Sequence, residues 1–260
     1  MSETVPAIVL AGGRKPEEVA RALGLPHKAL ALVAGKPVVR WVVEALQRAE
    51  SVGQVVVVTE LEAVVAALPE GVVVARPTGG GILDTIQAGF ARVPEADRCL
   101  TCTSDMPLLT PAAVDDFARR ALDSGAELCY SVVRGDRLQE GSTGEKRTLI
   151  SLRGGAYSGG NLFCMSRRFL EEEGPRVSAA FAARKNPVQL AALLGVGLIW
   201  GVLCGRLGIP QLSLEQVIAK AERILRVPVA VVDSEYPEIC FDIDKLVHVA
   251  VAEEALRGNG

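Results

Sequence analysis

The chain has 260 residues, enough for one large α/β domain, and its 28 basic and 31 acidic residues give a formal net charge of −3. Neither sign of charge forms a long block, and the chain has only six Phe, two Trp, three Tyr and two His residues. This composition excludes nucleic acid as an expected partner, because phosphate backbones need a basic surface and unpaired bases need aromatic platforms.

The first residues and the cysteines bear on the cellular compartment. Ser2, Glu3 and Thr4 are polar and the apolar run after them is short, so we predict no secretory signal and expect a cytoplasmic protein. The six cysteines lie mostly in apolar, strand-like runs, which is typical of reduced and buried thiols. Cys99 and Cys102 have the spacing of a zinc or redox half-site, but no second pair of suitable spacing follows, so burial is the preferred interpretation.

Strand and helix patterns alternate through the first half of the chain. Apolar, β-branched runs predict buried strands at 7–10, 54–59, 72–75, 98–103 and 127–133. Helical spacing of apolar residues predicts helices at 37–49, 84–92 and 111–123, the last opened by Thr110 and Pro111 and closed by Gly125. This alternation predicts the α/β class, with right-handed crossovers and a mainly parallel sheet.

The second half of the chain is less regular. Residues 134–160 are polar and glycine-rich and are interpreted as loops around a hairpin or lid, after which Ser158–Phe163 returns to a strand. Residues 187–204 are almost wholly apolar, so a membrane span is one interpretation, but Gln189, three glycines and the short length favour buried helices or an oligomer interface, such as that of a homodimer. An amphipathic helix follows at 213–225, capped by Ser213 with Gln216.

Three glycine-rich or polar turns follow predicted strands. Gly12 and Gly13 follow the first strand, Thr78–Gly81 the third and Ser104–Pro107 the fourth. Ligands of parallel sheets bind beyond the carboxyl ends of the strands, so we expect these turns to meet at one edge. Glycines let backbone N–H groups approach phosphates closely, although each turn is also consistent with a simple connection. Neither a Gly-x-Gly-x-x-Gly fingerprint nor a P-loop matches these turns.

Carboxylates at two distant places are candidate metal ligands. Asp105 ends an apolar strand, where an unpaired charge is costly, and its alternative interpretation is a turn or cap for the helix near Pro111. Asp242 and Asp244 are two residues apart, so they share one face if the segment is a strand. Together with Asp105 they can form an oxygen-rich Mg²⁺ site, or Asp244 caps the last helix and Asp242 is solvated.

These motifs together resemble a known superfamily. The likeness is to the glycosyltransferase-A-like nucleotidyltransferases, and within them to the molybdenum-cofactor guanylyltransferase-like NTP transferases. It is carried by Leu10-Ala11-Gly12-Gly13, Lys28 ahead of Gly35-Lys36-Pro37, Ser104–Pro107, Ser158–Leu162 and Phe241–Lys245. The resemblance implies a Rossmann-like three-layer sandwich in a single domain over residues 1–260. It also implies lid or substrate loops at 134–160 and a helical insertion at 185–226.

The resemblance implies a role for each matching residue. The first loop, with Leu10, Ala11, Gly12, Gly13 and Arg14, wraps the triphosphate; Lys28 steadies it; Asp105, beside Ser104, binds Mg²⁺. Asp242 is the first choice for a second metal ligand and Asp244 the second choice. Gly79, Gly80 and Gly81 stand where relatives contact the base or ribose, although three adjacent glycines are also typical of a flexible turn. The loop after Gly13 departs from the longer family pattern, because a helical insert reaches Leu23.

The implied activity is Mg²⁺-dependent transfer of a nucleoside monophosphate from an NTP, either GTP or CTP, to a phosphorylated small molecule, with release of pyrophosphate. Such in-line transfer needs positioning and charge neutralisation more than a protein nucleophile. His27 and His248, the two histidines, are interpreted as ordinary surface or helix residues. The alternatives are a cytidylyltransferase or sugar-1-phosphate nucleotidyltransferase on the same fold, and a non-catalytic nucleotide-binding module with membrane contact through 187–204.

Overall fold

The computed structural model describes residues 4–13, 17–77, 79, 81–140, 149–182, 204, 207 and 212–258. The strands are β1 Val5–Leu10, β2 Leu32–Val33, β3 Lys36–Pro37, β4 Val52–Val58, β5 Val73–Ala75, β6 Arg98–Thr103, β7 Leu128–Arg134, β8 Ile150–Leu152, β9 Gly155–Ser166 and β10 Val229–Asp233. The helices are α1 Glu18–Ala22, α2 Val38–Arg48, α3 Glu62–Ala67, α4 Ile82–Phe90, α5 Pro111–Asp123, α6 Gly135–Glu140, α7 Arg167–Ala182, α10 Leu214–Leu225 and α11 Leu246–Gly258, with 3₁₀ turns η1 Lys28–Leu30 and η3 Pro237–Cys240.

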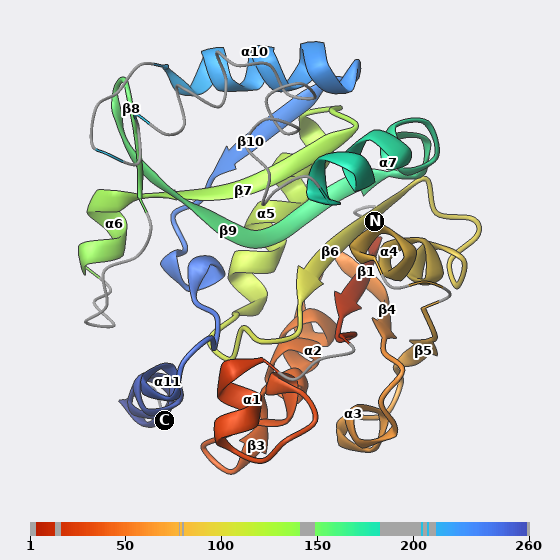
Figure 1. The fold of residues 1–260 in the computed structure, drawn as a ribbon, viewed down its shortest axis with the longest axis vertical. Coiled ribbons are helices and arrows are strands. Elements are labelled where there is room, and N and C mark those ends of the chain that lie inside the picture. The colour runs from red at the N-terminus through yellow and green to blue at the C-terminus, as the bar shows by residue number, and fades with distance from the viewer. Residues whose placement is uncertain are drawn as a thin grey trace.

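A mixed sheet runs through the centre of the molecule (Figure 1). Its strand order is β10-β7-β9-β6-β1-β4-β5, with β8 paired to β9. The pairs β1–β4, β1–β6, β4–β5 and β7–β10 are parallel, whereas β9 is antiparallel to both β6 and β7. The carboxyl ends of six strands therefore lie along one edge. The mainly parallel α/β sheet predicted from the sequence is confirmed, with β9 as the reversed strand among those described.

Most expected elements are present, and some boundaries agree to the residue. Strand β6 and helix α5 begin and end where predicted, and Thr110 caps α5 by accepting a hydrogen bond from the Ala113 amide. Ser213 and Gln216 form the expected capping box of α10. The expectation of loops over 134–160 is wrong in part, because α6 follows β7 directly and β9 already begins at Gly155. A β8–β9 hairpin is nevertheless present there.

Helices cover both faces of the sheet (Figure 1). Helices α2 and α5 pack against the face that carries Val9, and α4 and α7 pack against the face that carries Ile8. Alternate residues of β1 thus enter opposite cores, as expected for a strand buried on both faces. Helix α4 approaches strand β1 closely at Gly89, because glycine has no side chain there and a Cβ would lie only 2.5 Å from the Ile8 side chain. The three-layer arrangement holds the carboxyl edge of the sheet between two helical layers.

The structure excludes a zinc half-site at Cys99 and Cys102. Cys99 enters the core beside α4, and Cys102 enters the core beside α2 and α5, so the two thiols face opposite sides of the sheet. Both are buried and free, and burial raises the pKa of Cys99 to about 12. The apolar segment 187–204 lies outside the described residues except for Cys204. Within the part of the chain that the structure does describe, no helix has the length and apolar character needed to cross a membrane.

Candidate functional site

A hollow of about 300 Å³ opens at the carboxyl edge of the sheet, where the three predicted turns meet. The turn after β1 contributes Leu10, Gly12 and Gly13, and the turn after β5 contributes Gly79 and Gly81. Ser104 and Asp105, after β6, form the third wall beside Lys28. Of the other predicted residues, Ala11 is fully buried in the core, and Arg14 and Gly80 lie outside the described residues.

Asp105 is buried at this edge and is not a helix cap. Thr110 caps α5 instead, which removes the alternative interpretation of Asp105. The Asp105 carboxylate is only 3% exposed and places Oδ2 2.5 Å from the Lys28 ammonium. Its Oδ1 atom is buried and has no hydrogen-bond partner among the residues that the structure describes. A buried carboxylate oxygen without a donor is costly, so this atom requires a ligand that a lysine alone does not supply.

Lys28 joins the two candidate metal-binding segments. Its Nζ lies 2.5 Å from Asp105 and 2.7 Å from Asp244 Oδ1. Burial by itself lowers the pKa of Lys28, but the charge and hydrogen bonds of these two carboxylates outweigh burial and raise the pKa. Lys28 is therefore a fixed positive charge at the edge of the hollow.

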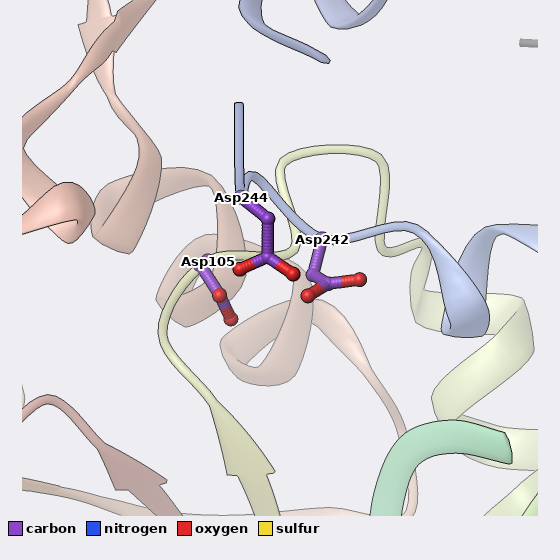
Figure 2. A group of neighbouring side chains, drawn as sticks. All are labelled: Asp105, Asp242 and Asp244. Carbon is purple, nitrogen blue, oxygen red and sulfur yellow. The ribbon is translucent and has the colours of Figure 1, made fainter. Parts of the chain in front are cut away.

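Asp242 and Asp244 lie between η3 and α11, and the prediction that they lie on a strand is wrong. The segment is extended but forms no ladder; the Ile243 amide donates to the Asp105 carbonyl oxygen at 3.0 Å. Phe241 and Ile243 are buried in a small core with α1, α2 and α11. Alternation along the extended chain therefore turns both aspartates toward Asp105, as Figure 2 shows.

The three carboxylates form a compact acidic cluster. Asp105, Asp242 and Asp244 each offer an oxygen atom, and these atoms all lie within 4.8 Å of one another (Figure 2). Burial, followed by the charges of Asp105 and Asp244, raises the pKa of Asp242 to about 6. For Asp244, burial by itself raises the pKa, but the hydrogen bond and charge of Lys28, together with smaller contributions from Asp242 and His248, outweigh burial and lower the pKa. The carboxylate charges thus remain only partly balanced by Lys28.

The glycines of the hollow differ in what the fold requires of them. A Cβ on Gly12 or Gly13 would meet its nearest neighbour at 3.8–3.9 Å, an ordinary contact, so packing does not demand glycine there. At Gly79, by contrast, a Cβ would collide with the Asp84 carboxylate. Asp84 also accepts a hydrogen bond from the Gly81 amide at 2.9 Å, which caps α4. Gly79 is thus explained by packing, whereas Gly12 and Gly13 leave their loop open toward the hollow.

Several residues of this site were not expected from the sequence. The interpretation of His27 as a surface or helix residue is wrong, because the ring is only 3% exposed and lines the hollow. Glu17, Glu60, Thr85 and Thr103 also line the hollow. The position of His27 directly before Lys28 was the one available indication. The other four lie on elements whose relative placement depends on the assembled sheet.

Comparisons with known proteins agree with this geometry. The family model of the MobA-like NTP transferase domain matches residues 7–193. A hypothetical transferase from Thermus thermophilus is 33% identical and superposes with a TM-score of 0.78, over 95% of this chain and 99% of that chain. CMP:2-keto-3-deoxy-manno-octonic acid synthetase, complexed with CTP, has the same fold, with a TM-score of 0.65 at 12% identity over 99% of this chain and 100% of that chain.

A curated relative covers a shorter region. The 3-deoxy-manno-octulosonate cytidylyltransferase of Anaeromyxobacter sp. (strain Fw109-5) is 31% identical over 107 residues, which are 40% of this chain and 43% of that relative. The family match is much longer, spans more than half of this chain and includes the three turns that meet at the hollow. The chain therefore belongs to the MobA-like NTP transferase domain family.

Proposed function

We propose that this protein is a nucleotidyltransferase that works at the hollow beside Lys28, where it moves a nucleoside monophosphate from an NTP to a small-molecule acceptor and releases pyrophosphate. The observation that carries the proposal is the juxtaposition of an open glycine loop, a fixed lysine charge and three clustered carboxylates. Phosphoryl-type transfer needs these elements: donors for phosphate oxygens, a cation for developing charge and ligands for a divalent metal.

The acidic cluster fits Mg²⁺. Its donors are all carboxylate oxygens, the class that hard divalent cations prefer, and Asp105 Oδ1, which has no hydrogen-bond partner among the described residues, is available to such a cation. Asp105 and Asp242 are the proposed ligands, with Asp244 second because Lys28 already occupies its Oδ1 atom. When bound, Mg²⁺ neutralises phosphate charge and makes the α-phosphorus more susceptible to attack.

The chain's own residues then hold the nucleotide. The open amides of Gly12 and Gly13 are proposed to donate hydrogen bonds to phosphate oxygens, as Arg14 is from the same loop. Lys28 is proposed to stabilise the charge that moves onto the leaving pyrophosphate. Gly79 and Gly81, on the far wall, are proposed to contact the base or ribose, and Ser104, which lines the hollow beside Asp105, is proposed to contact the nucleotide.

For the nucleotide we propose CTP, with GTP as the second candidate. The sequence resemblance pointed to a molybdenum-cofactor guanylyltransferase and hence to GTP. Support for CTP comes from the curated cytidylyltransferase relative, which is 31% identical over the matched region. For the acceptor we propose a phosphorylated small molecule, with an acidic sugar second because that relative is named for 3-deoxy-manno-octulosonate.

We also infer that the whole chain forms one domain with an insertion near 185–226. Strand β10 belongs to the same sheet as β1, and Asp242 and Asp244 return from the C-terminal part to the Lys28–Asp105 pair. A truncated chain that ends before Asp242, and so lacks both Asp242 and Asp244, is therefore expected to have no transfer activity. Resistance of the full chain to limited proteolysis, without separable active fragments, checks this inference.

The decisive experiment is a pyrophosphate-release screen. Each of the four NTPs is paired with phosphorylated sugars, alditol phosphates, a molybdopterin-type acceptor and 2-keto sugar acids, with Mg²⁺ or with EDTA. We expect release only with Mg²⁺, and most strongly with CTP. If NTP and Mg²⁺ raise the melting temperature but no acceptor yields pyrophosphate, a non-catalytic nucleotide-binding role replaces the proposed transfer. Equal release in EDTA contradicts the metal assignment.

A further inference from the structure

His27 contacts three parts of the phosphate-binding region at once. Its Nδ1 atom accepts a hydrogen bond of 3.1 Å from the Ala29 amide, which caps the η1 turn that carries Lys28. The ring edge, Cδ2 and Nε2, lies 3.9 Å from the place a Cβ would occupy on Gly13. Nε2 also lies 3.6 Å from Glu17 Oε1, at the start of α1. One buried imidazole thus connects the glycine loop, α1 and the Lys28 turn.

The contacts of the ring fix its tautomer. Because Nδ1 accepts from Ala29, the proton of the neutral ring resides on Nε2, which faces Glu17 and the Gly12–Gly13 loop. Burial lowers the pKa of His27, although the charges of Glu17 and Asp105 and a hydrogen bond with the Gly12 backbone act against it. A proton on Nδ1 would face the Ala29 N–H and remove the cap, so the η1 turn requires this single tautomer.

Glu17 supports the ring rather than its own helix. It stands at the N-cap of α1, but its side chain makes no capping hydrogen bond there. Its Oε1 faces His27, and its Oε2 is buried without a hydrogen-bond partner among the described residues. The carboxylate therefore does not cap α1, as a residue at this position often does, and lies instead beside the His27 ring.

We propose that His27 is a positioning residue that fixes the Gly12–Gly13 loop and Lys28 relative to each other, so that both contact the same triphosphate. This inference rests on the proposed function at the same site. The ring acts through other residues: Nδ1 sets the Lys28 turn, and the Nε2 edge supports the loop.

Two variants of His27 test the roles of Nδ1 and Nε2 separately. His27→Asn keeps an oxygen that can accept from Ala29, as good N-cap residues do, but loses the Nε2 edge. His27→Gln extends an amide toward the Nε2 position but loses the cap. We expect His27→Asn to raise the NTP KM about tenfold with kcat within about threefold, and His27→Gln to lower kcat about tenfold with KM within about threefold. Arg257→Gln, on an exposed helical pair far along the chain, is the matched control.

A second measurement does not depend on the variants folding. The chain has only two histidines, so long-range ¹H–¹⁵N NMR of the wild-type protein resolves both rings, and a His248 variant assigns them. We expect His27 at neutral pH to be the neutral Nε2–H tautomer. We expect its ¹⁵N shifts to move on addition of CTP with Mg²⁺ and not in buffer alone. An Nδ1–H or fully protonated ring overturns the inference.

The kinetic outcomes are equally decisive. A raised KM in His27→Asn and a lowered kcat in His27→Gln support the positioning role. The inference alone fails if the wild type is active and both variants show a lowered kcat and a raised KM in proportion to a lowered melting temperature. His27 is then a structural residue. If the wild type neither binds nor turns over any NTP, the proposed function fails as well.

Discussion

Two acidic hollows on this molecule look alike in composition but differ in how their charges are balanced. The second hollow, of about 620 Å³, is larger than the site and is lined by Glu50, Asp115, Asp116 and Asp123 among others. There Asp115 accepts hydrogen bonds from the Ser51 amide and hydroxyl at 2.8 Å and 2.6 Å. Asp116 is paired with Arg119 and Arg120.

The hollow beside Lys28 is the opposite case. Asp105 retains a buried oxygen without a partner among the described residues, and burial together with its acidic neighbours raises the pKa of Asp242 to about 6. In the second hollow the carboxylates are used to fasten the α2–β4 turn and the surface of α5. Neither size nor the number of acidic residues therefore marks a metal-dependent site; the unbalanced buried charge does.

The sharpest test of this difference removes the unbalanced carboxylate. Asp105→Asn is expected to lower kcat by about 10³-fold while the protein remains folded, because the removed charge belongs to a proposed Mg²⁺ ligand and not to the apolar core. Pyrophosphate release and circular dichroism measure the two effects. Asp116→Asn, the matched change in the second hollow, should leave release unchanged. Full activity of Asp105→Asn would remove the metal assignment.

Replacing the lysine tests the charge balance from the other side. Lys28→Met is expected to lower kcat about 10²-fold. It should also cost about 3 kcal/mol of stability, because Asp105 and Asp244 lose their buried cation. Thermal denaturation with and without Mg²⁺ checks the second effect, and the metal should raise the melting temperature more in Lys28→Met than in the wild type. An equal rise in both proteins would show that Lys28 does not oppose metal binding, and no rise in either would show that the cluster does not bind the ion.

A substitution in the open glycine loop is expected to have a smaller effect, which is confined to nucleotide binding. Gly12→Ala places a methyl group where the fold has room, since its nearest neighbours would lie at 3.8–3.9 Å. We expect the melting temperature to stay within experimental error and the NTP KM to rise about tenfold, because the methyl group obstructs a phosphate. Isothermal titration with a non-hydrolysable NTP measures the change. Unchanged affinity would show that the phosphates lie elsewhere.

A substitution in the second hollow is expected to lower stability without changing activity. Asp115→Ala leaves the Glu50 and Ser51 amides without their acceptor, at an expected cost of about 1–3 kcal/mol. Urea denaturation measures this loss, and pyrophosphate release below the new midpoint should match the wild type. A loss of activity without a loss of stability would mean that the second hollow contributes to function, and the contrast between the two hollows would no longer hold.

Local patterns predicted much of the fold. Strand β6 and helix α5 were bounded correctly because apolar runs and the Thr110–Pro111 cap act within a few residues. Helices α3 and α6, each of six residues, were not predicted, since one or two turns carry little periodicity. Strand β10 was also missed: it lies at the edge of the sheet and is only partly buried, so its sequence has a weaker strand pattern.

For the site, the sequence by itself determined which residue types could meet. It placed Gly12, Gly13 and Asp105 directly after strands, and the rule that parallel strands present their carboxyl ends together brings such turns to one edge. Tertiary structure alone decided how their charges are shared. Asp244 pairs with Lys28, Asp105 keeps an oxygen without a hydrogen-bond partner among the described residues, and buried His27 joins the loop to the lysine. Those outcomes depend on burial and on distances of a few ångströms in the folded chain, as between Lys28 and Asp244, 216 residues apart, which no local pattern encodes.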